Sequence, residues 1–406
     1  MNLRKLRTTP APDRSVYGTS RCGDTSRTQK PVVLAAFLAV ALLVSLAACS
    51  SDDDSGDGTG AGSAGGGGGG GDQDAVGDLL DVLASDVIVP GYADLVEQLD
   101  GLGTAIDDLC AQPGPAALDA ARAAWRTTAD TWQGTRPVGV GPAMDRRLMS
   151  QVAYPIRPND VAEVLAGTEP VTPESLSADS ATTRGLAAVE LLLFEPDASD
   201  AELAAGPAGG RRCTYAAAAT TLAGTATAEV LADWTGEGEA PEAYTETFVA
   251  GMEGGDPQTS LSAVVNEVAH ALQTIDDQGL RGIATAADPA DLPRNQRDGP
   301  AGHRVADLKA LLATVAVVIE GPNGDDGLGA LVSARSDETG QRLDDALAAA
   351  RSTVEVLPDS IPDTLAAPDD LAAAGDAVAE LKVVVSTEVA SLLGITIGFS
   401  DADGDS

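Results

Sequence analysis

The chain has 406 residues, of which 44% are hydrophobic, so it is long enough to bury a core in one large or two ordinary domains. Its 62 acidic residues outnumber its 25 basic ones and give a formal net charge of −37 at pH 7. A nucleic-acid backbone would be repelled by this charge, so nucleic acid is excluded as a partner. Cations are the natural counterpart, although an acidic surface that only keeps the protein soluble explains the same composition.

Aromatic residues make up only 3% of the chain, while alanine and leucine recur throughout. Close packing of helices through small residues suits this composition better than an aromatic-rich β-sandwich. The composition therefore predicts an all-α fold. We expect two helical-bundle halves, at residues 78–238 and 239–406, after an exported leader and a flexible tether.

The N-terminal segment has the layout of a secretory signal. A polar and basic stretch, residues 1–31, precedes the apolar run Val32 to Ala48, which Cys49 follows directly. The ending Leu-Ala-Ala-Cys is typical of a bacterial lipobox and predicts a signal peptide over residues 1–48 with acylation of the Cys49 thiol. We expect a lipid-anchored protein on the extracytoplasmic face of the cell membrane. An uncleaved apolar anchor is the alternative.

Residues 49–77 are mostly Gly, Ser and Asp and contain few side chains that could build a core. Such sequence behaves as flexible coil. A coil of about 25 residues has a root-mean-square reach of roughly 25–30 Å. We therefore expect a tether that holds the folded domain clear of the lipid headgroups.

Helical periodicity begins at Asp78 and continues through residue 109. We expect Pro90-Gly91 to break it into two helices. A third helix carries Trp125 and Trp132, which lie seven residues apart and therefore share a face. Core packing is the expected role of both indoles, with a platform for a ligand as the alternative.

The central stretch of the chain combines a long connection with a very apolar helix. Residues 143–181 contain repeated prolines and predict an irregular connection with one short helix. Residues 182–196 then predict a helix that is apolar on nearly every side. Glu190 lies among these apolar residues, and a carboxylate removed from water needs an ion pair, hydrogen bonds or a metal. We expect an arginine of the tryptophan-bearing helix as its partner.

The segment from Gly185 to Glu190, GLAAVE, resembles the GxHxxE helix of the imelysin family. The glycine and the glutamate match, and Ala187 occupies the place of the histidine. The family contains envelope proteins grouped with a metallopeptidase and with iron-regulated proteins. Its histidine and glutamate share one helix face and could both bind a metal, so the resemblance makes Glu190 a candidate metal ligand. The missing histidine argues against catalysis.

Other segments resemble the same family in the same order. They are the tryptophan-bearing helix that leads to Gly141-Pro142, the Arg-Cys-x-Tyr opening at Arg212, and the C-terminal Gly-Phe pair before Asp-Gly-Asp. The resemblance implies an all-helical domain of two bundles. A second helix-to-Gly-Pro passage at Gly321-Pro322 suggests that the two bundles arose by internal duplication.

Cys110 and Cys213 are the two cysteines that remain after the lipidated Cys49 in the exported chain. An even pair in an oxidising compartment predicts one disulfide. Two buried free thiols are the alternative.

Two histidines occur in the whole chain, which limits any metal site. Glu267 and His270 stand three apart on one face of a predicted helix and form a candidate pair of metal ligands. A hydrogen-bonded or exposed histidine without a metal is the alternative. His303 opens a helix in a Gly/Pro-rich context, and we expect it to be exposed. A divalent metal or iron is the cofactor that these residues suggest.

No HExxH, GxSxG, Walker or GxGxxG motif occurs in a suitable context. A catalytic zinc site usually takes three protein ligands and an activated water, and the motif helix supplies one. We therefore predict a non-catalytic binding lipoprotein of the cell envelope that serves the acquisition of iron or another metal. A metal-dependent peptidase of the imelysin type is the first alternative. An envelope adaptor with a protein partner is the second.

Overall fold

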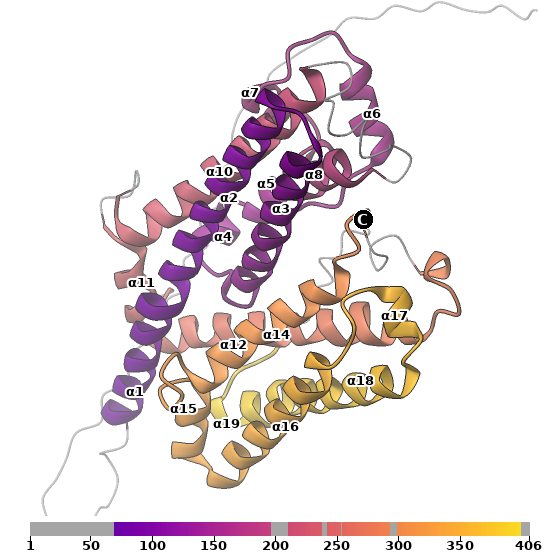
Figure 1. Cartoon of the computed structure of the whole chain (residues 1–406). Helices are drawn as coiled ribbons and strands as arrows, with labels where there is room; N and C mark the ends of the chain where they lie inside the picture. Colours follow the sequence, from indigo (N-terminus) through magenta and orange to yellow (C-terminus); the bar gives the residue numbers. More distant parts are fainter. Residues whose placement is uncertain (1–68, 196–209, 238–241, 253, 293–298, 399–406) are drawn as a thin grey trace, which may run out of the picture. The chain divides into compact units, whose positions relative to one another are not determined.

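The computed structural model describes residues 69–195, 210–237, 242–252, 254–292 and 299–398, and every regular element in these parts is a helix (Figure 1). The prediction of an all-α fold is confirmed. The described residues all belong to one compact unit, Gly65–Ser406. The predicted signal peptide, Cys49 and most of the predicted tether lie outside the described residues. No helix in the described ranges is both long enough and apolar enough to span a membrane.

The first helical stretch is longer than expected and has no break at its proline. Helix α1 (Gly69–Val82), the π-helical segment η1 (Leu83–Ile88) and helix α2 (Val89–Ala111) follow one another directly. Pro90 stands in the first turn of α2, where an α-helix needs no backbone N–H donor. The widened π-helical turn before it makes room for the ring, so the chain stays helical across Pro90-Gly91.

Helix α1 begins at Gly69, inside the segment predicted as tether. Its first turn carries Asp72, whose carboxylate lies 3.0 Å from the guanidinium of Arg335. One turn further on, Val76 is buried in the core. These two contacts explain why the helix extends into glycine-rich sequence, where propensity alone predicts coil.

The first group of helices packs around α2. Helices α3 (Pro115–Thr135) and α10 (Arg211–Thr235) lie along α2, and α8 (Gly185–Phe194) packs against both α3 and α10. Short helices occupy the connection that was predicted as mainly irregular: α4 (Pro142–Asp145), α5 (Leu148–Val152), α6 (Pro158–Ala166) and α7 (Pro173–Ala178).

The second group contains four longer helices: α12 (Pro257–Gln273), α14 (Arg304–Glu320), α16 (Asp337–Glu355) and α18 (Pro368–Val383). Helix α16 packs on α18, and α12 contacts both α14 and α18. Shorter elements complete the group: α11 (Tyr244–Ala250), η4 (Thr274–Leu280), α13 (Arg281–Ala284), α15 (Leu328–Arg335), α17 (Ile361–Leu365), η7 (Val384–Val389) and α19 (Ala390–Leu393). Helix α14 also packs against α3. The internal duplication stays a prediction.

Cys110 and Cys213 form a disulfide, with their Cα atoms 5.7 Å apart. The bond links the C-terminal end of α2 to the first turn of α10. It therefore joins two helices that are far apart in sequence and pack along each other.

Candidate functional site

The motif helix α8 begins with a residue that only glycine suits. Gly185 has φ +76°, and a Cβ atom there would lie 2.4 Å from the carbonyl oxygen of Val152 at the end of α5. Both the left-handed conformation and the close backbone approach exclude a side chain. The first motif position is thus explained by the packing of α8 on α5.

Two side chains from α3 hold the two ends of α8. At its N-terminal end, Trp125 Nε1 donates to the carbonyl oxygen of Leu186 at 2.8 Å. At its C-terminal end, Arg122 Nε donates to the carbonyl oxygen of Leu193 at 2.9 Å, which satisfies a carbonyl that the helix leaves open. Both tryptophans of α3 are buried, Trp125 at 5% and Trp132 at 6% exposure, in agreement with a packing role.

Glu190 is half-buried and lies against the loop that leads into α14. The backbone N–H of Ala301 donates to Glu190 Oε1 at 3.0 Å. A Cβ atom at Gly299 would lie 2.1 Å from the same oxygen, so the loop backbone sits directly on the carboxylate. This backbone amide is one partner of the carboxylate, and the arginine of α3 that we expected as a partner stays a prediction. Glu190 therefore helps to fix the loop that precedes His303.

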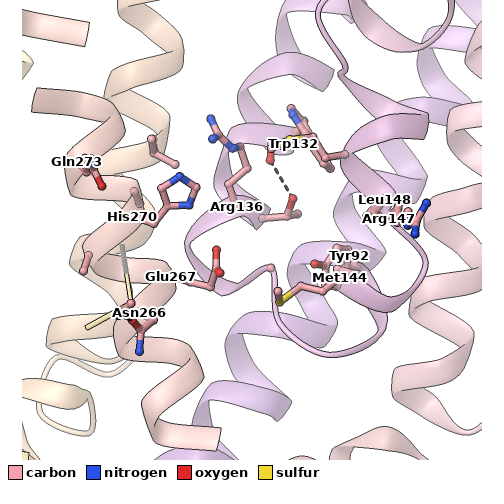
Figure 2. A pocket seen from close by; sticks show the side chains of 18 of the residues that line it. Tyr92, Trp132, Arg136, Met144, Arg147, Leu148, Asn266, Glu267, His270 and Gln273 are labelled. Atoms are coloured by element: carbon pink, nitrogen blue, oxygen red, sulfur yellow. Dashed lines mark hydrogen bonds between the residues drawn. The ribbon is translucent and has the colours of Figure 1, made fainter. Parts of the chain in front are cut away.

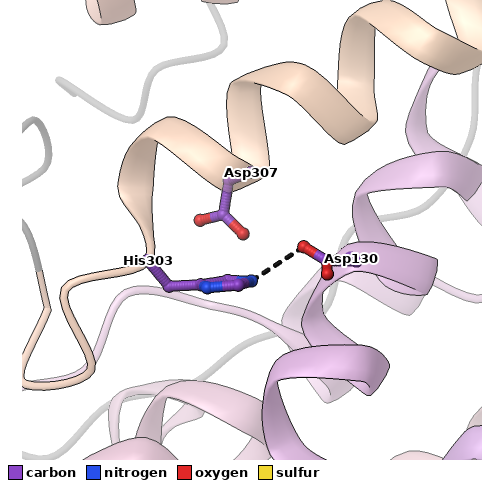
Figure 3. Close-up of side chains that lie close together, drawn as sticks. All are labelled: Asp130, His303 and Asp307. Atoms are coloured by element: carbon purple, nitrogen blue, oxygen red, sulfur yellow. Dashed lines mark hydrogen bonds and ion pairs between the residues drawn. The ribbon is translucent and has the colours of Figure 1, made fainter. Parts of the chain in front are cut away.

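Three side chains of the kind that bind metals meet where α3 packs on the start of α14 (Figure 3). Asp130 comes from α3, and His303 and Asp307 come from the N-cap and first turn of α14. His303 Nε2 lies 2.7 Å from Asp130 Oδ1. One potential ligand atom from each of the three residues lies within 4.8 Å of the other two. We call these three residues the cation cluster.

The expectation of an exposed His303 is wrong. Its side chain is 12% exposed, because the imidazole packs edge-on against Trp125, with ring centroids 5.8 Å apart, and binds Asp130. The Gly/Pro-rich sequence around it predicted exposure, yet that loop lies against α8 through Glu190. Local composition could not show this contact.

Burial shapes the electrostatics of the cation cluster. Removal from water raises the pKa of Asp307 to about 6, although the charges of Arg304 and His303 oppose the shift. Burial by itself would lower the pKa of His303, but the hydrogen bond and the charge of Asp130, together with the charge of Asp307, raise it. Asp307 Oδ1 is buried and has no hydrogen-bond partner among the described residues. An unpaired buried acceptor of this kind is unfavourable unless something binds it.

The residues of the cation cluster fit a divalent ion. Bonds from such ions to imidazole nitrogen and carboxylate oxygen are about 2.0–2.2 Å long, so ligands of one ion lie roughly 3–4 Å apart. Donor atoms within 4.8 Å of one another reach this spacing by small side-chain movements. One imidazole with two carboxylates suits zinc, iron(II) or manganese(II). Three protein ligands would leave further positions for water or another ligand.

The sequence-based candidates lie outside the cation cluster. Glu190 contacts the residue two positions before His303, so it borders the cluster. Glu267 and His270 line a separate cavity, and His270 is exposed. One signal for the cluster was present in the sequence, because His303 and Asp307 are spaced i, i+4 and so share a helix face. No signal pointed to Asp130, which lies 173 residues away from His303.

The cavity has a volume of about 370 Å³ and lies between α12 and the end of α3 (Figure 2). Burial raises the pKa of Glu267 in its wall to about 7, against the opposing charge of Arg136. Burial, followed by the charge of Glu267, also raises the pKa of Tyr92. Burial and the neighbouring Arg304 lower the pKa of Arg136. The cavity thus has a buried polar end.

The raised pKa of Glu267 predicts that the free energy of unfolding depends on pH. Its folded pKa of about 7 lies above the ordinary value of 4.5, so its contribution is fully present below pH 4.5 and is lost as the pH rises through 7. We expect Glu267→Gln to raise the free energy of unfolding by about 1–3 kcal/mol at pH 8 and by about 1 kcal/mol or less at pH 5. Denaturant titrations at both pH values measure this difference. The exposed Glu355 of α16 provides the control Glu355→Gln, and an equal gain at both pH values for Glu267→Gln would contradict the prediction.

Together, these features define an all-helical protein with a cluster of potential cation ligands where two helices meet and a cavity nearby. The chain belongs to the Imelysin (Peptidase_M75) family, whose sequence model matches residues 88–387. This finding confirms the family that the sequence resemblance indicated. No curated protein is similar enough in sequence to match the chain.

Two solved structures share this fold. A protein from Parabacteroides distasonis, provisionally named iron-regulated protein A precursor, is 17% identical, with a TM-score of 0.68 over 79% of this chain and 95% of its own. An imelysin-like protein from Psychrobacter arcticum is 21% identical, with a TM-score of 0.65 over 80% of this chain and 98% of its own. At this level of identity the two likenesses show the fold alone.

Proposed function

We propose that this protein is a non-catalytic binding protein of the cell envelope and that it binds iron(II) or another divalent metal at the cation cluster. The observation that carries the proposal is Asp307 Oδ1, a buried acceptor with no hydrogen-bond partner among the described residues, beside an imidazole and a second carboxylate. The relative from Parabacteroides distasonis has a name that links it to iron. We extend that link to this chain as part of the proposal.

The geometry around the motif helix supports binding over catalysis. On the sequence resemblance, Ala187 takes the place of the motif histidine, so α8 would offer the single carboxylate of Glu190. That carboxylate accepts a hydrogen bond from the backbone of Ala301 and lies against Gly299. In this role Glu190 positions the loop before His303, and the metal ligands come from α3 and α14.

The test is a direct measurement of metal binding by the mature protein. Calorimetry with iron(II), zinc, manganese(II) and calcium, followed by elemental analysis, should show one ion per chain. We expect His303→Ala and Asp307→Asn each to weaken binding by about 100-fold, because each removes one of three ligands. Asp345→Asn, at an exposed aspartate of α16, is the control for the loss of one negative charge.

The outcome separates the two sets of candidate ligands. If His270→Ala abolishes binding while His303→Ala does not, the ion is held by Glu267 and His270 and the cation cluster is excluded. If no ion binds at millimolar concentration, the metal-binding proposal fails.

A metal-dependent peptidase is a second candidate, because three protein ligands with open positions form the usual pattern of catalytic zinc sites. Incubation of an unstructured protein substrate with the metal-loaded protein tests it. Cleavage that is lost with a chelator, with His303→Ala and with Glu190→Gln would overturn the non-catalytic proposal. We expect no cleavage above the level of the chelated sample.

The proposal includes export and a lipid anchor at Cys49. The name of the Parabacteroides distasonis relative includes the word precursor, which supports export. We expect Cys49→Ala to abolish both acylation and the cleavage after residue 48, as measured by mass spectrometry of the protein from membranes. Normal processing of that variant would contradict the lipoprotein prediction.

A further inference from the structure

The cavity beside α12 is separate from the cation cluster, since the two share no residue. Its volume of about 370 Å³ lies within the range of sites that bind small molecules, roughly 300–1,000 Å³. Its walls are mainly apolar and include Trp132, Ala143, Met144, Leu148, Met149 and Leu311. The cavity can therefore hold an apolar body.

Two methionines stand exposed beside this cavity. Met144 is 58% exposed and Met149 is 45% exposed, and both line the cavity. Unbranched, polarisable methionine side chains adapt to apolar ligands of different shape. Large apolar side chains that remain in water beside a cavity are expected where a ligand covers them.

The backbone that carries these methionines is held in an unusual conformation. Gly141 has φ +57°, and a Cβ atom there would lie 2.3 Å from the ring of Tyr244. Arg147 has φ +51° and is the one non-glycine residue with positive φ in the described parts of the chain. A left-handed arginine persists only where the surroundings impose it, and such positions are concentrated at functional sites. The cavity wall is thus pre-organised.

The polar end of the cavity contains a donor and an acceptor that lack hydrogen bonds. Arg136 Nε is buried and has no hydrogen-bond partner in the described parts of the chain. The Glu267 carboxyl group is largely buried and makes no hydrogen bond within the described residues. Figure 2 shows Arg136 and Glu267 on one side of the cavity, with Tyr92 and Met144 facing them. Each unpaired buried group is unfavourable, so a ligand that satisfies both gains affinity.

We propose that this cavity binds a small neutral amphiphile with an apolar body and a terminal carboxamide. The amide carbonyl accepts from Arg136 Nε, and the amide N–H donates to the Glu267 carboxylate. Above pH 7 the buried end of the cavity carries the opposite charges of Arg136 and Glu267, while Arg147 and His270, which also line the cavity, are exposed. At pH 8, where the probes below are compared, a third charge on the ligand would be left uncompensated at this buried end. A carboxylate would face Glu267, and an ammonium group would face Arg136. A neutral group avoids both contacts.

Three probes with one apolar body test this ligand class: 4-phenylbutanamide, 4-phenylbutanoate and 4-phenylbutylammonium. Binding to the mature wild-type protein at pH 8 is followed by calorimetry and by tryptophan fluorescence, to which Trp132 in the cavity lining contributes. We expect the amide to bind about tenfold more tightly than either charged probe, as follows from one unpaired buried polar group. Equal or tighter binding of a charged probe would overturn the proposal, and so would the absence of amide binding up to its solubility limit.

Substitutions of Glu267 test whether the amide N–H of the ligand donates to this carboxylate. Glu267→Gln keeps an acceptor and should preserve amide binding within about threefold, whereas Glu267→Leu should weaken it about tenfold. Glu355→Leu, at an exposed glutamate outside the cavity, should leave binding unchanged. If Glu267→Gln and Glu267→Leu weaken binding equally, the hydrogen bond to Glu267 is refuted.

The charge series on the wild-type protein does not depend on any variant that could fail to fold. The comparison of the three probes and the comparison of the Glu267 variants are also independent of metal binding at the cation cluster. His303→Ala should therefore weaken metal binding by about 100-fold and preserve amide binding, so the two proposals can fail separately.

Discussion

Replacing both Cys110 and Cys213 by alanine is expected to lower the free energy of unfolding by about 4–5 kcal/mol. The disulfide joins residues 103 positions apart and so restricts a long loop of the unfolded chain. Cross-links that close long loops remove the most conformational entropy from the unfolded state. In the folded state the bond ties α2 to α10, two helices that pack along each other. This is the largest single effect that we expect for a change outside the candidate sites.

Denaturant unfolding of the oxidised wild type, the reduced wild type and the double alanine variant measures this effect. Reduction and substitution should lower stability by similar amounts, because both remove the same cross-link. A double variant within about 1 kcal/mol of the oxidised wild type would contradict the prediction and would place these cysteines among ordinary packing residues.

Replacing Gly185 by alanine is expected to destabilise the protein by about 3 kcal/mol and to weaken metal binding. Alanine at φ +76° is unfavourable by about 1–2 kcal/mol, and its Cβ atom would also lie 2.4 Å from the Val152 carbonyl oxygen. The Cβ position at Gly185 is fixed by the backbone of α8, and the Val152 carbonyl belongs to the backbone of α5. Neither can therefore move without shifting its helix. A displaced α8 would carry Glu190 away from Ala301 and loosen the loop before His303.

Gly394 provides a matched control for this change. It also has a positive φ, +68°, but a Cβ atom there would meet nothing within 4 Å. We therefore expect Gly394→Ala to lower stability by only about 1 kcal/mol and to leave metal affinity unchanged. Thermal or denaturant unfolding and metal titration of both variants provide the comparison. If the two glycine variants lose stability and metal affinity to the same extent, the close approach of α8 to α5 does not add to the destabilisation.

Much of the helical architecture was predictable from local sequence patterns. Apolar residues at helical spacing indicated α2, α3 and α12, because one buried stripe is enough to show a helix, and α8 was indicated by a run that is apolar on nearly every side. The pairing of Cys110 with Cys213 was predictable because these two cysteines remain after the predicted signal peptide and Cys49. The motif glycine and glutamate of α8 likewise indicated the family.

The misplaced expectations all concern contacts that local patterns do not contain. The break at Pro90 was predicted from the proline alone, whereas the π-helical turn before it keeps the chain helical. Residues 69–77 have the composition of a tether, yet Asp72 and Val76 make contacts that start α1 at Gly69. His303 lies in loop-like sequence but is covered by Trp125.

The cation cluster shows which part of the candidate site local sequence patterns could not predict. Helical spacing brings His303 and Asp307 onto one face without any tertiary information. Asp130 joins them only because α3 packs against α14, and that contact places groups 173 residues apart within hydrogen-bonding distance. Asp307 Oδ1 is buried by the same packing and has no hydrogen-bond partner within the ranges that the structure describes. Sequence periodicity specifies which residues share a helix face, whereas a binding site depends on which faces meet, and that is set by the packing of the whole core.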